Sequence, residues 1–211
     1  KTPSPLLSKF KGKHVKKNNR VILVGTKTWV RTVRIDHAPE PNSAINYRAD
    51  KILFVKSLKK EVKNNLYYKP YTRSETNFED EGYLSKACPD VSILKESLNK
   101  SMLNCRLVVL DHPGTSLHLA MAMGVPILCY WNDRDWLLVS SAKEFFEQLR
   151  EAKILFRNPI DAANHLNNIY DEGEDWFNSV NLLNIRKRWS DQFAFSKRFW
   201  WIDWLKVLPQ I

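Results

Sequence analysis

Residues 106–136 read RLVVLDHPGTSLHLAMAMGVPILCYWNDRDW and contain three predicted elements in succession. Residues 106–110 are a short apolar run that fits a buried parallel strand. Residues 117–123 are apolar nearly all round, which is typical of a helix packed on a sheet, and Gly124 supplies its C-terminal stop. Residues 125–131 form the next strand. The stretch therefore predicts one strand-helix-strand unit of a parallel sheet.

The loop inside this unit is a candidate phosphate site. Gly114, Thr115 and Ser116 open the predicted helix at the carboxyl end of a strand, where open α/β folds bind ligands. Their N–H groups, two hydroxyls and the helix dipole together favour a phosphate. A Thr or Ser at a helix N-cap also satisfies orphan N–H groups in a helix that binds nothing. Taken alone, the residues leave both interpretations open.

The rest of the chain continues the alternation of strands and helices. Strands are predicted at residues 21–25, 66–71 and 154–156, and helices at residues 45–62, 91–102, 142–151 and 158–170. The polar segment 72–89 is predicted to be a surface loop with a short turn. This alternation predicts an α/β fold, a Rossmann-like parallel sheet with helices on both faces.

A resemblance to a known family enters at residues 111–136. The order strand, D-x-P-G-T-S, apolar helix, G-x-P-I and a strand ending in an aromatic residue resembles the donor-binding half of GT-B glycosyltransferases, their C-terminal-type domain. Within that class, the stretch is similar to surface-carbohydrate transferases of the Leptospira O-antigen type and to bacterial retaining β-Kdo transferases. The match is strong here and weaker over most of the chain.

The resemblance implies a nucleotide-sugar donor whose sugar is transferred with retention of configuration, and the β-Kdo transferases suggest CMP-Kdo as that donor. It also implies a glycan or glycolipid acceptor bound by an N-terminal acceptor-binding domain. No metal cofactor is expected, because a helix N-terminus with hydroxyls can stabilise a phosphate without a metal, and the sequence has no P-loop or Gly-rich dinucleotide fingerprint. Under this hypothesis, Gly114, Thr115 and Ser116 hold the donor phosphate.

Glycosyl transfer also needs a carboxylate near the anomeric carbon. The long segment 27–43 follows the first strand, and Asp36 is the candidate because His37 and two arginines beside it would keep it ionised. His37 is the candidate proton shuttle. Asp111 is expected to be a turn-former instead. A solvated loop acid is the alternative for Asp36.

Two cations and an aromatic residue complete the predicted site. Lys69 and Arg73, in the K-P-Y-T-R ending of the second strand, could pair with a donor phosphate or carboxylate, or form a surface ion pair. Trp131 is the predicted stacking residue for a base or sugar, together with Trp136. Core packing is the alternative for both tryptophans.

The net charge of +10 is unevenly distributed. Residues 1–35 hold ten Lys and Arg and no acid, whereas the remaining 23 Lys and Arg balance 23 Asp and Glu. The predicted domains are a basic linker or arm at 1–20, a nucleotide-sugar-binding domain at 21–173, and C-terminal helices at 174–211. A neutral body without a recognition motif argues against nucleic acid as a partner.

The C-terminal helices are rich in Trp and Phe. They are expected to pack on the domain or on a missing N-terminal half; peripheral membrane association is a competing interpretation. No run of 18 apolar residues and no signal peptide is visible, and three cysteines without ligand spacing fit a reducing compartment. These features predict a cytoplasmic protein, and the resemblance implies a glycosyltransferase domain for lipopolysaccharide O-antigen or capsule synthesis. The alternative is a non-catalytic binding or scaffold domain that docks a partner through its aromatic tail.

Overall fold

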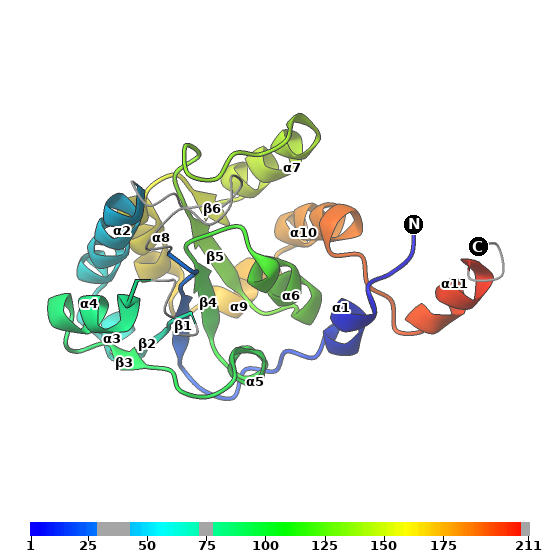
Figure 1. Cartoon of the computed structure of the whole chain (residues 1–211). Coiled ribbons are helices and arrows are strands. Elements are labelled where there is room, and N and C mark those ends of the chain that lie inside the picture. The colour runs from blue at the N-terminus through cyan, green and yellow to red at the C-terminus, as the bar shows by residue number, and fades with distance from the viewer. Residues whose placement is uncertain (29–42, 72–77, 208–211) are drawn as a thin grey trace.

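The core of the protein is a single sheet of six parallel strands (Figure 1). The computed structural model describes residues 1–28, 43–71 and 78–207. The strand order is β3-β2-β1-β4-β5-β6, with β1 and β4 at the centre. In chain order the strands are β1 Val21–Val24, β2 Leu66–Lys69, β3 Ser92–Ile93, β4 Leu107–Leu110, β5 Ile127–Tyr130 and β6 Leu155–Phe156. This confirms the predicted α/β class with a parallel sheet.

Helices cover both faces of the sheet, and two hydrophobic clusters fill the layers between (Figure 1). On one face lie α1 Pro5–Phe10, α5 Leu98–Met102, α6 Thr115–Met123, α7 Ser140–Glu151, α9 Gly173–Phe177 and α10 Val180–Phe193. On the other lie α2 Ala44–Ser57, α3 Lys60–Asn64, α4 Asp80–Ala87 and α8 Pro159–Ile169.

The two-sided burial explains the continuous apolar strands. In β1, Ile22 and Val24 belong to the first cluster, whereas Val21 and Leu23 belong to the second. Successive side chains of a strand point to opposite faces, so a central strand covered on both sides must be apolar at every position. All four residues of β1, of β4 and of β5 are buried.

The prediction of one continuous helix at residues 45–62 is wrong. It is two helices, α2 and α3, because the backbone turns extended at Leu58 (φ −74°, ψ 142°). Asn167 of α8 bridges the break: its side-chain oxygen accepts from Lys59 N at 2.8 Å and its amide donates to Ser57 O at 3.0 Å. Backbone groups freed by the break are thus satisfied from a neighbouring helix, which sequence periodicity does not show.

Two further predictions are corrected between β2 and β4. The expected loop at 72–89 contains helix α4, whose first turn is capped by the Glu79 carboxylate accepting from Gly82 N at 2.7 Å. The expected helix 91–102 is strand β3 followed by α5. Val91 and Leu94 share a helical spacing, yet they are buried on opposite faces of the sheet, which only extended backbone allows.

The basic N-terminal arm is part of the packed domain rather than a solvated linker. Ser4 caps α1, accepting from Leu7 N at 3.3 Å, and the Leu7 side chain is buried in the core. Beyond α1, Gly12 N and His14 N donate to carbonyls at the end of α6, at 2.8 and 3.1 Å. Leu7 and these backbone hydrogen bonds anchor the arm, and Lys11 Nζ also donates to Ser196 O at 2.6 Å, whereas Leu6 and Val15 are exposed.

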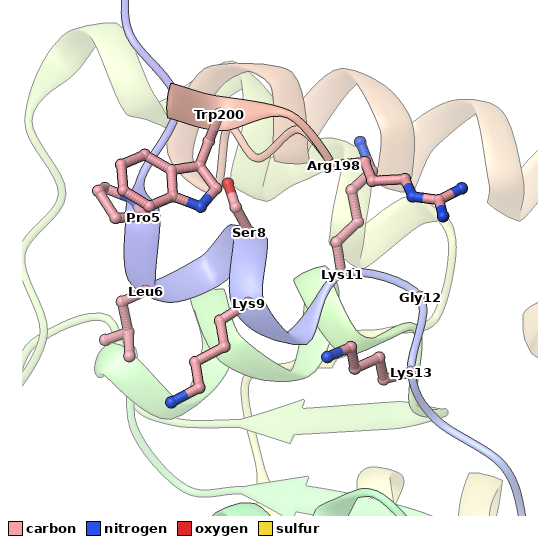
Figure 2. A pocket seen from close by; sticks show the side chains of 9 residues that line it. All are labelled: Pro5, Leu6, Ser8, Lys9, Lys11, Gly12, Lys13, Arg198 and Trp200. Atoms are coloured by element: carbon pink, nitrogen blue, oxygen red, sulfur yellow. The ribbon is translucent and has the colours of Figure 1, made fainter. Parts of the chain in front are cut away.

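The C-terminal helices differ in how much of their surface is covered. Trp189 of α10 and Phe177 of α9 are buried, whereas α11 Trp200–Val207 has no buried residue. Between α1 and α11 lies an open groove of about 1040 Å³, lined by Lys9, Lys11, Lys13, Arg198 and Trp200 among others (Figure 2). No helix in the described ranges is long and apolar enough to cross a membrane.

Gly124 ends α6 in the left-handed conformation (φ 79°), as predicted. Gly124→Ala should destabilise the fold by about 1–2 kcal/mol, because a Cβ strains this conformation, while the nearest neighbour, at 4.0 Å, leaves room for the methyl group. Gly173→Ala is the matched control, since that glycine is not in the left-handed region and its nearest neighbour lies at 3.9 Å. Urea unfolding should show a lower midpoint for the first variant only; equal midpoints would contradict the conformational argument.

Candidate anion site at the carboxyl edge of the sheet

A cavity of about 490 Å³ opens at the carboxyl ends of β1, β2 and β4. In the strand order of this sheet, connections leave β1 and β4 in opposite directions, so the cavity lies at the switch point where open α/β sheets bind ligands. It is lined by residues that follow these strands, by the start of α6 and by two aromatic residues: Val24, Gly25, Thr26, Lys27, Lys69, Pro70, Tyr71, Leu98, His112, Gly114, Thr115, Ser116 and Trp136.

The N-terminus of α6 faces this cavity without a side-chain cap. The N-cap residue is Gly114, so Thr115 and Ser116 are the first two helical residues, and neither hydroxyl caps the helix. Leu117 N donates to Gly114 O at 2.9 Å. Within the described residues, the N–H groups of Thr115 and Ser116 have no acceptor. Thr115 and Ser116 therefore do not act as N-cap residues of α6, which was the alternative to a phosphate site. The positive end of the helix is left open to an anion.

Gly114 is required by its contact with His112. A Cβ at this position would lie 2.7 Å from both Nε2 and Cδ2 of the imidazole, closer than side chains approach one another. The absence of a side chain lets the imidazole lie against the first turn of α6. His112 is buried, and its ring is 6.0 Å from that of Trp136 across the cavity wall.

Behind the cavity, Asp111 is the centre of a buried polar network. Its carboxylate accepts from Tyr47 Oη at 2.7 Å and from His112 Nδ1 at 2.9 Å, and it lies 3.4 Å from Lys51 Nζ. Lys51 in turn donates to Tyr68 Oη at 2.9 Å. Asp111 and Lys51 are each 2% exposed, so the pair is removed from water. The network ties α2 to the ends of β2 and β4.

The network keeps Asp111 ionised. Burial by itself raises the pKa of this carboxyl, but the ammonium of Lys51 and the hydrogen bonds from His112 and Tyr47 outweigh it and lower the pKa below its usual value. Burial also lowers the pKa of Lys51, yet Tyr68 and Asp111 stabilise the ammonium and leave that pKa raised. Burial raises the pKa of Tyr68 to about 12, so this hydroxyl stays protonated.

Gly25, directly after β1, leaves space for two side chains of this network. A Cβ there would overlap the Tyr68 hydroxyl and approach Lys51 Nζ to 3.1 Å. The neighbouring Thr26 N donates to Tyr47 Oη at 3.0 Å. The glycine is therefore explained by close approach of buried side chains rather than by backbone conformation.

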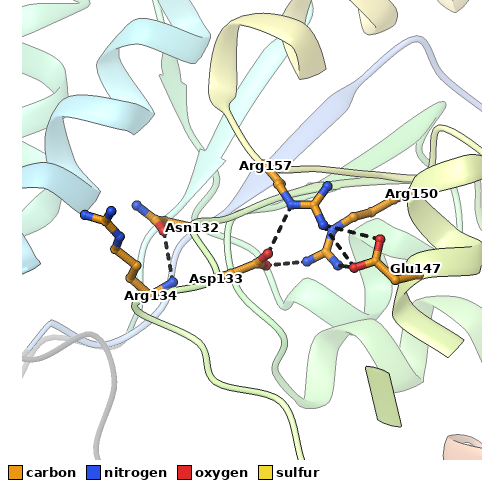
Figure 3. A network of polar contacts seen from close by, with 6 residues as sticks. All are labelled: Asn132, Asp133, Arg134, Glu147, Arg150 and Arg157. Carbon is orange, nitrogen blue, oxygen red and sulfur yellow. Dashed lines mark hydrogen bonds and ion pairs between the residues drawn. The ribbon is translucent and has the colours of Figure 1, made fainter. Parts of the chain in front are cut away.

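The loop after β5 carries Trp136 to the cavity and is held by ion pairs (Figure 3). Asp133 pairs with Arg150 of α7 and with Arg157, whose Nε lies 3.1 Å from the carboxylate. Both arginines also pair with Glu147 of α7. Such a network is more persistent than an isolated surface pair, and it fixes the loop relative to α7.

The structure brings together four of the predicted site residues. Gly114, Thr115, Ser116 and Lys69 all line the cavity, with Lys69 Nζ held by Glu96 O at 2.9 Å. Trp131 does not line it: this side chain is buried in the core against Phe146, and Trp136 occupies the cavity wall instead. The predicted Asp36, His37 and Arg73 lie outside the described residues.

Sequence reasoning missed the network behind the cavity. Asp111 was expected to form a turn, but it is buried among three donors, which is the environment of a structural carboxylate. His112, Tyr47 and Lys51 were not predicted at all. The only signal for the last two is their spacing of four residues, which places them on the same face of α2. Across the described ranges, no group of three or more acidic, His or Cys side chains could hold a metal ion.

Fold and site together define an α/β protein with an uncapped helix N-terminus beside a cavity at the switch point of its sheet. Residues 1–208 match the model of the LIC12162 family of transferases, and the chain belongs to that family. A comparison with curated proteins gave no match.

Two solved structures are distantly similar to the chain. One is WaaG, described as a glycosyltransferase involved in lipopolysaccharide biosynthesis, with 14% identity, a TM-score of 0.42 and 91% of this chain covered. The other is the spinosyn forosaminyltransferase SpnP, with 13% identity, a TM-score of 0.44 and 100% of this chain covered. The chain spans 49% and 46% of the lengths of these two proteins.

Removing one partner of the Asp111–Lys51 pair should destabilise the protein strongly. Lys51→Met leaves a buried carboxylate without its cation, and we expect a loss of about 3–5 kcal/mol in the free energy of unfolding. The double variant Lys51→Met/Asp111→Asn should lose less than the sum of the single variants, because it removes both charges. Additive losses in urea unfolding would show that the two side chains are not coupled.

The same network predicts acid sensitivity. Because the folded-state pKa of Asp111 is lowered, its contribution to stability is present above the unfolded pKa and is lost as the pH falls through the folded value. Unfolding measured from about pH 6 to about pH 3 should therefore show stability falling below about pH 4. Asp111→Asn should flatten this slope. An unchanged slope would assign the acid sensitivity to other carboxyl groups.

Proposed function

We propose that the chain is the nucleotide-sugar-binding part of a glycosyltransferase, with the donor phosphate bound at the N-terminus of α6. The observation that carries this proposal is the first turn of α6: Thr115 and Ser116 line a cavity, and their N–H groups have no acceptor among the described residues. Membership in a transferase family supports the assignment to group transfer.

The chemistry of the cavity suits a departing phosphate. When a glycosidic bond to a nucleotide breaks, the bonding pair leaves with the phosphate oxygen, and the negative charge there must be stabilised. Thr115 and Ser116, which begin α6 and carry hydroxyls, line the cavity together with Lys27 and Lys69, so the helix dipole and two cationic residues act on the same space. These groups can stabilise the phosphate without a metal ion.

The aromatic wall fits the remainder of a nucleotide. Trp136 and the half-exposed Tyr71 line the same cavity as the phosphate groups. Flat rings of this kind stack on bases and on the apolar faces of sugars. In our proposal Trp136 takes the stacking role that the sequence predicted for Trp131.

The carboxylate that serves the anomeric carbon is a separate part of the proposal. Asp111 is unsuited to it, because both of its oxygens are engaged by buried donors. We retain Asp36, assisted by His37, for this role. As the finer assignment we propose CMP-Kdo as donor, transfer with retention to a glycan or glycolipid, and a place in surface polysaccharide synthesis such as O-antigen or capsule.

The exposed surface of α11 is the part of the chain that we connect with acceptor binding. Trp201 and Leu205 of this helix are 49% and 59% exposed, and Leu6 of α1 is 54% exposed beside the groove. We propose that an acceptor-binding half of the enzyme covers this surface. The same exposure favours the second candidate function, a scaffold domain that docks a partner through its aromatic tail, and docking on a membrane surface is a third arrangement.

Donor binding separates the glycosyltransferase from the scaffold. Titration calorimetry with CMP, UDP and GDP should detect binding of at least one nucleotide. Ser116→Ala should weaken that binding by about 1–3 kcal/mol, the range for hydrogen bonds to charged groups. Thr115→Ala should behave alike.

The matched control is Ser140→Ala, at the start of α7 and away from the cavity, which should bind like the wild type. Failure of every nucleotide to bind would favour the scaffold. Unchanged affinity in both hydroxyl variants would move the phosphate away from α6.

A further inference from the structure

His112 presents a polar atom to the cavity for which the described residues supply no partner. Its side chain is 8% exposed, and its Nδ1 is bonded to Asp111 at 2.9 Å. Its Nε2 lies against Gly114, 2.7 Å from where a Cβ would be, and this imidazole lines the cavity beside the first turn of α6. A buried imidazole with one nitrogen satisfied and the other at the mouth of an open helix N-terminus points to a ligand.

The bond to Asp111 decides what Nε2 can do. An ionised carboxylate only accepts hydrogen bonds, so the Nδ1 of His112 carries the hydrogen in their contact. In the neutral ring, Nε2 then carries a lone pair and can only accept a hydrogen bond. A phosphate oxygen is also an acceptor, so the neutral ring would repel it. In the charged ring, Nε2–H donates and forms a charge-assisted hydrogen bond, which is stronger than a neutral one.

Resting on the function proposed above, we infer that His112 binds the donor phosphate as an imidazolium through Nε2–H. Asp111 is the positioning residue, because its hydrogen bond with Nδ1 orients the ring. The phosphate would then accept hydrogen bonds both from the imidazolium and from the N–H groups of α6. Phosphate binding is consequently coupled to the uptake of one proton.

The charged and titratable groups around His112 come from several elements. Asp111 faces its Nδ1 edge, with Lys51 and Tyr47 of α2 behind that carboxylate. Lys27 after β1 and Lys69 after β2 line the same cavity, and the facing Trp136 carries no charge. Histidine is the side chain whose charge ordinarily changes between about pH 5 and 8, whereas Asp, Lys and Tyr titrate outside that range.

The test measures affinity as a function of pH with ligands whose own charge is constant. The probes are cytidine 5′-methyl phosphate, a phosphodiester, and UDP-glucose, both titrated calorimetrically from about pH 5.5 to about pH 8.5 across the histidine range. Wild-type affinity should fall by roughly ten- to one hundred-fold over this range, the magnitude of a hydrogen bond between charged groups.

Two substitutions at one position separate positioning from contact. His112→Asn retains an amide that can donate to Asp111 but has no atom at the place of Nε2; it should bind weakly at every pH. His112→Gln offers a neutral donor toward the phosphate, and it should bind with intermediate affinity and no pH dependence. His165→Asn, in α8 on the other face of the sheet, should retain the wild-type profile. Thermal unfolding of each variant checks that it is folded.

The outcomes distinguish this inference from the function on which it rests. A pH-dependent wild type beside pH-independent His112 variants supports it. Wild-type binding that is independent of pH, or a His112→Asn variant that keeps the wild-type profile, overturns the role of His112 and leaves the phosphate site intact. Absence of wild-type binding to any nucleotide or phosphodiester at every pH contradicts the proposed function and the inference together.

Discussion

The buried pair of Asp111 and Lys51 is the constraint on which the site depends. Two opposite charges, each almost completely removed from water, are tolerated only because Tyr47, Tyr68 and His112 complete their hydrogen bonds. The pair connects α2 to the carboxyl ends of the central strands. It thereby fixes the loop that leads from β4 into α6, and with it the direction in which the first turn of α6 points.

Several small features serve this one arrangement. Gly25 makes room for Tyr68 and Lys51, and Gly114 makes room for the imidazole of His112, so both glycines are explained by side chains that approach them closely. The ion pairs of Asp133 hold the next loop, which brings Trp136 to the cavity. The result is a cavity lined by cationic residues, by the start of α6 and by an aromatic ring. Such a combination suits a nucleotide better than it suits an uncharged ligand.

The sheet and the position of the helix start that lines the cavity were predictable from the sequence, because both follow from local patterns. The apolar run 107–110, the turn at Gly114 and the stop at Gly124 carry their own signals of strand, loop and helix. The network around Asp111 was not predictable, because its members come from α2, β2 and β4 and meet only after the sheet has formed. Trp131 and Trp136 differ in position by five residues, and only packing shows that the first enters the core while the second reaches the cavity. The break between α2 and α3 likewise depends on Asn167, more than one hundred residues away in the chain.

The central claim is that a nucleotide phosphate binds at the start of α6, and backbone amide resonances test it most directly. In a titration followed by ¹H–¹⁵N correlation spectra, CMP should shift the amide signals of Thr115 and Ser116 more than others, while cytidine, which lacks the phosphate, should leave them in place. The internal control is the amide signal of Gly124 at the far end of the same helix, which should not shift with either ligand. If CMP shifts signals elsewhere and leaves Thr115 and Ser116 unchanged, the phosphate site is not at α6 and the account is contradicted.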